Sequence, residues 1–190
     1  MSSGTDTGPV GHIPSGGLRQ LGPINWIIAK LAARSLCAPE MHLFTILGQR
    51  QVLFWTWLAY GGQLLSGKLP RVDTELVILR VAHLRACEYE LQHHRGMARK
   101  KGLDANMQAM VFAWPDVHVP AGGGLSVRQQ ALLAATDEFI KDRKITNGSW
   151  QQLATHLDRH QLIEFCMLIS HYDGLAATIS SLDIPLDNPR

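Results

Sequence analysis

Side chains suited to acid–base and thiol chemistry gather in one short segment, Cys87–His94 (CEYELQHH). On a helix each residue advances by about 100°, so Cys87, Glu90 and His94 would lie within about 60° of one another. A thiol, a carboxylate and an imidazole would then project from one face. Glu90 and His94 are four residues apart, a spacing at which helical side chains meet. A carboxylate that accepts a hydrogen bond from an imidazole fixes the ring's tautomer, as general-base catalysis requires.

The thiol of Cys87 has opposing influences on its reactivity. The first turn of a helix favours a thiolate, whereas the carboxylate of Glu90 disfavours it. We therefore predict that Cys87 reacts slowly with peroxide. Cys37 and Cys166, the other two cysteines, lie in apolar patterns typical of packing, and the sequence has no CxxC. A metal bound by this cluster would need further ligands that the sequence does not offer, so we predict no metal and no cofactor.

The rest of the chain has the periodicity of helices and no strand-length alternation, which predicts an all-α fold. Asp73 is a candidate N-cap for a helix over 74–86. Gly102 is a candidate terminator of the following helix. Ser126 and Gln129 have the spacing of a capping box. Further helices are predicted to begin at Pro23, at Pro39 (ending at Gly61), after Gly148, and at Asp158 (ending at Leu182).

The composition is that of a soluble globular protein, with 46% hydrophobic residues, 18% charged residues and a net charge of +2. Because the basic residues are scattered, we do not expect a nucleic-acid partner. The apolar, Trp-rich stretch 43–65 contains polar residues and is not a membrane span, but it suits a subunit interface. Residues 1–22 are predicted to be a flexible tail and 23–190 a single helical domain in a cytoplasmic protein.

Around the Cys87 cluster the sequence resembles the carboxymuconolactone decarboxylase and alkylhydroperoxidase D superfamily. The likeness runs from Leu69-Pro70 to Gly102-Leu103, and 137–186 looks like the C-terminal half of one subgroup. Peroxidases of this superfamily carry a glutamate, eleven residues, a CxxC, three residues and a histidine. In this chain Glu75, Cys87 and His94 match three of those four positions.

Glu90 stands where the second cysteine of the peroxidases would be. Without a neighbouring thiol, Cys87 cannot close a disulfide across the motif. The resemblance implies an alkylhydroperoxidase D-like helical domain, a homo-oligomer and a small-molecule substrate, and it places Glu75 in the site. Three further side chains are candidate binding residues, the last of them in a family-like Ser-His-Tyr run: Tyr89, His93 and His171.

We predict a cofactor-free, lyase-like enzyme that uses acid–base chemistry on a small organic molecule such as a lactone or a carbonyl acid. His94 would be the base or acid, Glu90 would orient it, and Glu75 or Cys87 would bind substrate or carry a proton. One alternative is a thiol-dependent peroxidase, an oxidoreductase using Cys87. Another is a non-catalytic oligomer that only binds a ligand.

Overall fold

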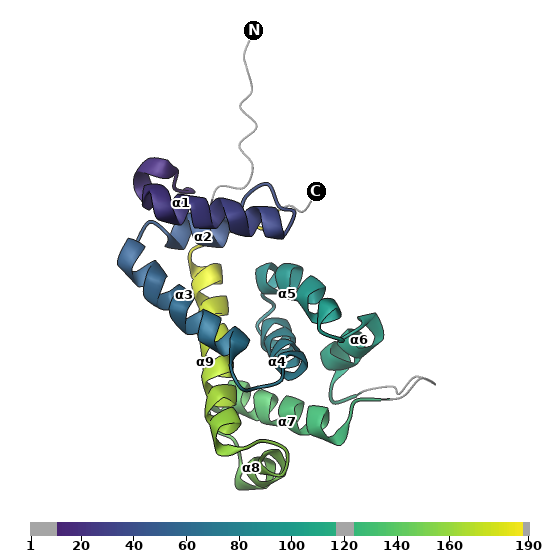
Figure 1. The fold of residues 1–190 in the computed structure, drawn as a ribbon. Helices are drawn as coiled ribbons and strands as arrows, with labels where there is room; N and C mark the ends of the chain where they lie inside the picture. The colour runs from purple at the N-terminus through teal and green to yellow at the C-terminus, as the bar shows by residue number, and fades with distance from the viewer. Residues whose placement is uncertain (1–10, 117–123, 188–190) are drawn as a thin grey trace. The chain divides into compact units, whose positions relative to one another are not determined.

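A computed structural model describes residues 11–116 and 124–187 of the chain (Figure 1). In these ranges the chain forms nine helices and no strand, which confirms the all-α prediction. The helices are Leu18–Ser35 (α1), His42–Leu47 (α2), Gln51–Ser66 (α3), Arg71–Leu84 (α4), Glu88–Lys100 (α5), Ala105–Ala113 (α6), Val127–Asp142 (α7), Asn147–Ala154 (α8) and Arg159–Ser181 (α9). The predicted tail over 1–10 and the predicted loop over 117–123 lie outside the described residues.

The chain divides into two compact units. Unit 1 consists of Met1–Trp57 and Thr178–Arg190, and unit 2 of Leu58–Ala177. The boundaries fall inside α3 and α9, so each of these helices contributes residues to both units. Both boundaries lie inside a helix, and the sequence has no Pro- or Gly-rich linker at either of them.

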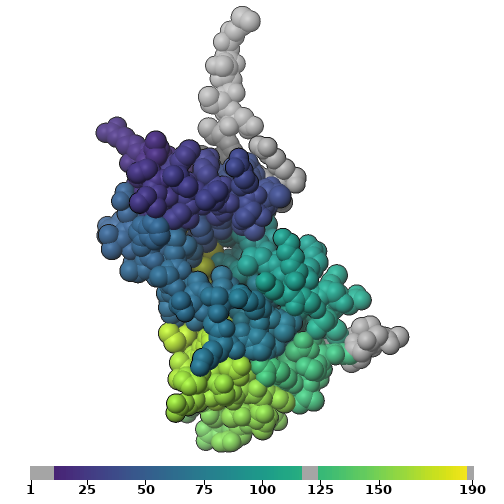
Figure 2. All heavy atoms as spheres, viewed as in Figure 1, coloured from purple at the N-terminus to yellow at the C-terminus, as the bar shows by residue number. Residues whose placement is uncertain are grey.

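The first helix of unit 1 begins at Leu18, earlier than the predicted start at Pro23, so the end of the predicted tail is helical. Gly22 has φ of 72° and kinks the helix, and only glycine adopts this left-handed region freely. Proline at the next position then starts the main helical segment. Helix α1 lies at the surface (Figure 2), where Ile24 and Leu31 are 60% and 58% exposed.

The helix predicted from Pro39 to Gly61 is in fact two helices, α2 and α3. The break lies at Gly48, where a Cβ atom would lie 2.5 Å from both the Leu21 side chain and the Phe44 carbonyl oxygen. Phe54 is buried beside the break, stacked on Trp57 and edge-on to Phe44. Phe54 is therefore a core residue of unit 1, and the half-buried rings of Phe44 and Trp57 cover it. Val52 and Leu53 of α3 are 80% and 64% exposed, and the subunit interface expected over 43–65 stays a prediction.

Helix α3 continues through Gly61-Gly62 to Ser66, beyond its predicted end. The turn that follows is fixed by Glu164 of α9, whose carboxylate accepts hydrogen bonds from the backbone N–H groups of Lys68 (2.8 Å) and Leu69 (3.4 Å). This carboxylate fills the space where a side chain at Gly67 would lie, so a larger residue there would displace it. A contact between distant segments, rather than the two glycines, decides where the helix ends.

The central helix of unit 2 is α4, which packs against α5, α6 and α7. Residues 73–82 are buried on all sides, with Leu76–Leu79 fully inaccessible to solvent, as the prediction of a central helix, apolar on most sides, expects. Asp73 does not cap this helix, because the N-cap is Pro70. Asp73 lies instead in the first turn, where its carboxylate pairs with Arg128 of α7 at 2.7 Å.

The predicted boundary signals elsewhere in unit 2 are confirmed. Ser126 and Gln129 form the capping box of α7. Gly102 follows the C-cap of α5 with φ of 103°. The short helix α6 was not predicted; Asp104 caps it by accepting a hydrogen bond from the Met107 N–H at 2.8 Å.

Helix α9 is the one described helix with the length and apolar composition of a membrane span. It also buries Phe165, Leu168 and Ile169 completely inside the protein. A core helix of a soluble protein has the same composition, and this burial favours that interpretation.

His42, at the start of α2 in unit 1, binds the C-terminal segment through Asp187. Its backbone N–H and its Nδ1 lie 2.8 and 2.5 Å from the buried carboxylate of Asp187. The hydrogen bond to Asp187 raises the pKa of His42, burial acts in the opposite direction, and the charges of Asp187 and Glu40 raise the pKa further. Protonated His42 therefore stabilises the folded chain below pH of about 6.5, and this contribution is lost as pH rises through the elevated pKa.

We expect His42→Ala to destabilise the protein by about 1–2 kcal/mol more at pH 5.5 than at pH 9.5. Urea unfolding at the two pH values measures the difference. His160 is exposed and serves as the control, since His160→Ala should show almost no such pH dependence. An equal cost of His42→Ala at both pH values would contradict the prediction.

Candidate functional site

Three of the predicted site residues meet in unit 2. His94 of α5 lies between two carboxylates: its Nδ1 is 2.9 Å from Glu75 Oε2 of α4, and its Nε2 is 3.3 Å from Glu90 Oε2, one turn earlier on α5. All three side chains are at least 93% buried. The i,i+4 spacing brings Glu90 to His94, and the packing of α4 against α5 brings Glu75.

The geometry determines the protonation state of His94. A neutral imidazole has one N–H, so beside two carboxylates its other nitrogen would turn a lone pair toward an oxygen atom. Only the imidazolium donates a hydrogen bond to both. Burial alone would lower the pKa of His94, but hydrogen bonds to Glu75 and Glu90 and their negative charges raise it to about 9. At neutral pH the resting site therefore holds an acid, His94, rather than the free base that the sequence also allowed.

Cys87 lies just outside α5, at its N-cap position, rather than in the first helical turn. Its side chain is buried and forms no disulfide. Burial raises the pKa of the Cys87 thiol, the N–H groups of Glu90 and Tyr89 act against this, and the charges of Glu90 and Glu88 raise it further. The thiol is therefore protonated at neutral pH, and helix α5 does not activate it as a nucleophile.

Helix α9 adds an aromatic residue that sequence reasoning did not select, Tyr172. Its ring meets that of His94 edge-on, with 5.3 Å between the centroids and 87° between the planes. Burial and then the charges of Glu90 and Glu75 raise the pKa of Tyr172 well above 10, so the phenol keeps its proton. Tyr172 follows buried Leu168 by four residues, a spacing that indicates a core position and nothing more. Its contact with His94 could be found only from the fold.

His171, a predicted binding residue, lies beside the site through Tyr172. Its ring meets the ring of Tyr172 edge-on at 5.3 Å and that of Tyr60 at 5.1 Å. Burial lowers the pKa of His171, and the charge of Glu90 opposes this shift. His171 is therefore a neutral imidazole at neutral pH, in contrast to His94.

Tyr89 and His93, the other predicted binding residues, contact each other on α5, with their ring centroids 4.8 Å apart. Tyr89 is buried and His93 is half-buried.

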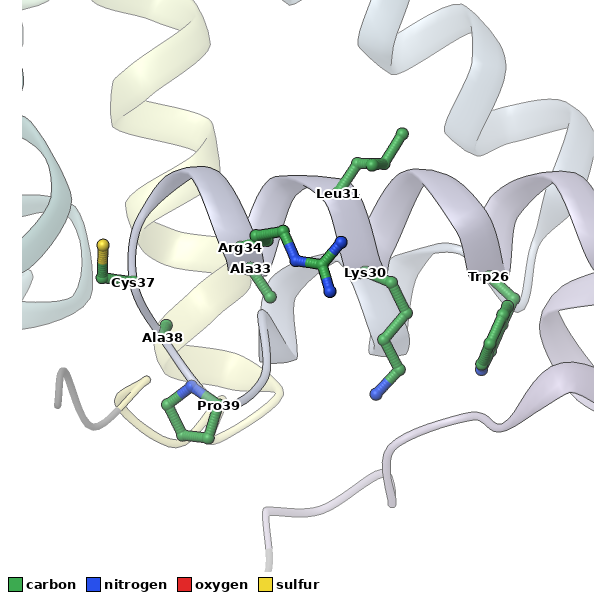
Figure 3. Close-up of a pocket in the computed structure, with 8 residues that line it drawn as sticks. All are labelled: Trp26, Lys30, Leu31, Ala33, Arg34, Cys37, Ala38 and Pro39. Atoms are coloured by element: carbon green, nitrogen blue, oxygen red, sulfur yellow. The ribbon is translucent and has the colours of Figure 1, made fainter.

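The cavities described in unit 1 contain none of these side chains. The larger has a volume of about 640 Å³ and lies along α1, with two basic side chains and a tryptophan in its wall (Figure 3). A smaller one of about 250 Å³ shares Trp26, Lys30 and Ala33 with it. Among residues 11–116 and 124–187, no group of three or more His, Cys, Asp or Glu is arranged to hold a metal ion.

A buried arginine anchors the helix that carries Glu75. Arg80 of α4 donates two hydrogen bonds of 2.7 Å to the carboxylate of Asp137 on α7. It also donates to the carbonyl oxygens of Val111 and Trp114, each at 3.0 Å. These bonds join α4, the end of α6 and α7, and so fix the position of α4 in unit 2.

The region that contains the His94 site, residues 51–137, matches the model of the carboxymuconolactone decarboxylase family. This part of the chain therefore has the sequence pattern of that family. The match covers Glu75, Cys87, Glu90 and His94, but it ends before Tyr172. No curated protein matches the sequence.

Solved structures share the fold at low sequence identity. An uncharacterised peroxidase-related protein from Ralstonia eutropha with an alkylhydroperoxidase AhpD core is similar at a TM-score of 0.79 and 14% identity, over 96% of this chain and 95% of its own. A peroxidase-related protein from Silicibacter is similar at a TM-score of 0.73 and 14% identity, over 95% of this chain and 94% of its own. The debrominase Bmp8, in complex with 2,3,4-tribromopyrrole, has a TM-score of 0.73 and 13% identity, over 92% of this chain and 91% of its own. At these identities the likeness establishes an alkylhydroperoxidase D-like helical fold and no reaction.

Proposed function

We propose that the protein is an enzyme that moves protons on a small organic molecule, with the imidazolium of His94 as its acid. The observation that carries this proposal is the contact of His94 with two buried carboxylates. The acid, His94, lies close to two potential bases, Glu75 at 2.9 Å and Glu90 at 3.3 Å, which is the equipment that enolisation of a carbonyl compound requires.

The two contacts of His94 suggest different roles for the carboxylates. The shorter one, 2.9 Å from Nδ1 to Glu75, holds the ring in place. The longer one, 3.3 Å from Nε2 to Glu90, is the weaker, so Nε2–H is the proton that a substrate oxygen could accept. Glu90 would then be released to take a proton from the substrate carbon. The proton lost by His94 returns from solvent or from Glu90, and no redox partner is needed.

Exchange of carbonyl α-protons in deuterated water tests this proposal. The full chain is incubated with a panel of lactones and ketones, and loss of each α-proton signal is followed by NMR. We expect at least one compound to exchange faster with the protein than in buffer of the same pH. A panel in which no compound exchanges faster would contradict the proposed function.

The alternative function, a thiol peroxidase, is not supported by the state of Cys87, because its pKa is raised and it has no partner thiol in the motif. We expect the wild-type protein to consume hydrogen peroxide slowly in the presence of a dithiol reductant. Cys87→Ser should leave proton exchange within about threefold of the wild-type rate. Rapid peroxide turnover that disappears in Cys87→Ser but persists in His94→Gln would replace the acid–base proposal with the peroxidase.

A further inference from the structure

We propose that Tyr172 is a substrate-binding residue, whose hydroxyl donates a hydrogen bond to an uncharged carbonyl oxygen beside His94. This inference rests on the proposed function, because it names the class of molecule that the His94 site takes. It narrows the expected substrates from lactones and carbonyl acids to neutral lactones, ketones and esters.

The hydroxyl group of Tyr172 lacks a partner. The side chain is 5% exposed, and in the part of the chain that the structure describes its hydroxyl makes no hydrogen bond. Tyr60, which contacts the other side of this cluster through His171, donates a hydrogen bond to the carbonyl oxygen of Met167 at 3.4 Å. The oxygen is not one of the fully enclosed unpaired atoms of the described residues, so the hydroxyl is accessible, and an accessible donor without a protein partner beside His94 points to a ligand.

The position of this hydroxyl suits a carbonyl oxygen. The Tyr172 ring lies edge-on against that of His94, with 5.3 Å between the centroids, which brings the phenol ring and the imidazolium into one site. Because the pKa of Tyr172 is raised well above 10, the hydroxyl is a donor and not a base. Two donors directed at one carbonyl oxygen would stabilise the negative charge that develops on it during enolisation.

The charges of the site exclude an anionic substrate. Glu75 and Glu90 are both buried, and His94 is their one cationic partner among the described residues. Of the two arginines on the same helix as Glu75, Arg80 is already paired with Asp137, and Arg71 is exposed and donates to the Leu65 carbonyl oxygen. A substrate carboxylate would therefore face two buried carboxylates with no cation of its own, and like charges in a buried site repel strongly.

Binding of matched ring compounds to the full chain tests the inference without requiring turnover. The probes are cyclohexanone, tetrahydropyran, which has no carbonyl, and the anion cyclohexanecarboxylate, with affinities measured by NMR titration. We expect the wild-type protein to bind the ketone more tightly than either of the others. Tyr172→Phe should weaken ketone binding by about 3–10-fold and leave tetrahydropyran binding unchanged.

Tyr60→Phe is the matched control, since it removes a phenol hydroxyl that already has a protein partner, and it should not change ketone affinity. Tyr172→Phe should also unfold in urea at the same concentration as the wild type or at a higher one, because the lost hydroxyl has no protein partner to stabilise.

Equal ketone affinity of the wild type and Tyr172→Phe would overturn the inference. So would tighter binding of the carboxylate, or no preference for the ketone over tetrahydropyran. Failure of the proposed function has a different signature: Tyr172-dependent ketone binding without any proton exchange would overturn the function and leave this binding site standing.

Discussion

His94→Gln should slow proton exchange on a carbonyl substrate by about 10²–10⁴-fold, the range that a positioned acid or base contributes. Glutamine still forms hydrogen bonds to Glu75 and Glu90, but its amide does not transfer a proton at neutral pH. The rate of α-proton loss, measured by NMR for the wild type and the variant at equal concentration, gives the effect. Circular dichroism serves as the control for folding, since the variant should retain the helical spectrum.

The pH dependence supplies a second check on the same residue. Because the acid is His94 with a pKa of about 9, wild-type exchange above the uncatalysed rate should fall as pH rises through about 9. Glu75→Gln removes a hydrogen bond and a charge that raise this pKa but leaves the proposed base Glu90 in place, so the fall should move to lower pH. A wild-type rate that rises steadily through pH 9, or His94→Gln exchange within tenfold of the wild-type rate, would remove His94 from the mechanism.

Arg80→Met should lower the free energy of unfolding by about 3–5 kcal/mol, the largest loss of stability that we expect. Arg80 is 4% exposed and donates to Asp137 and to the carbonyl oxygens of Val111 and Trp114. Methionine fills much of the same volume, but it leaves the carboxylate and the carbonyl oxygens without these donors. Such a loss is a large part of the stability of an ordinary domain.

Urea unfolding with linear extrapolation measures this loss. Arg99→Met is the control, because Arg99 is exposed and its replacement should change stability by no more than about 0.5 kcal/mol. Arg80→Lys should fall between the two, since one ammonium group cannot reproduce the paired bonds to Asp137. If Arg80→Met and Arg99→Met differ by less than about 1 kcal/mol, the buried ion pair does not anchor α4.

Much of this fold follows from interactions between residues close together in the sequence, and these can be predicted from the sequence alone. The helices follow from apolar periodicity, and the ends of α5 and α7 from Gly102 and from the capping box of Ser126 and Gln129. Local rules were wrong where a distant residue intervenes. Gly61-Gly62 predicted the end of α3, but the helix continues to Ser66, and Glu164 holds the turn that follows. Asp73 was predicted to cap α4, but its carboxylate pairs with Arg128 instead.

The same division holds at the site. By itself, the sequence determined that Glu90 and His94 share a helix face, because that is a consequence of i,i+4 spacing, and the family pattern supplied Glu75. Only the tertiary structure placed Glu75 and Glu90 on opposite nitrogens of one imidazole, and so decided that His94 is protonated at rest. Only the tertiary structure brought Tyr172 from α9 to that ring. Protonation and unpaired hydrogen bonds depend on every group around an atom, and residues far apart in the sequence supply those groups.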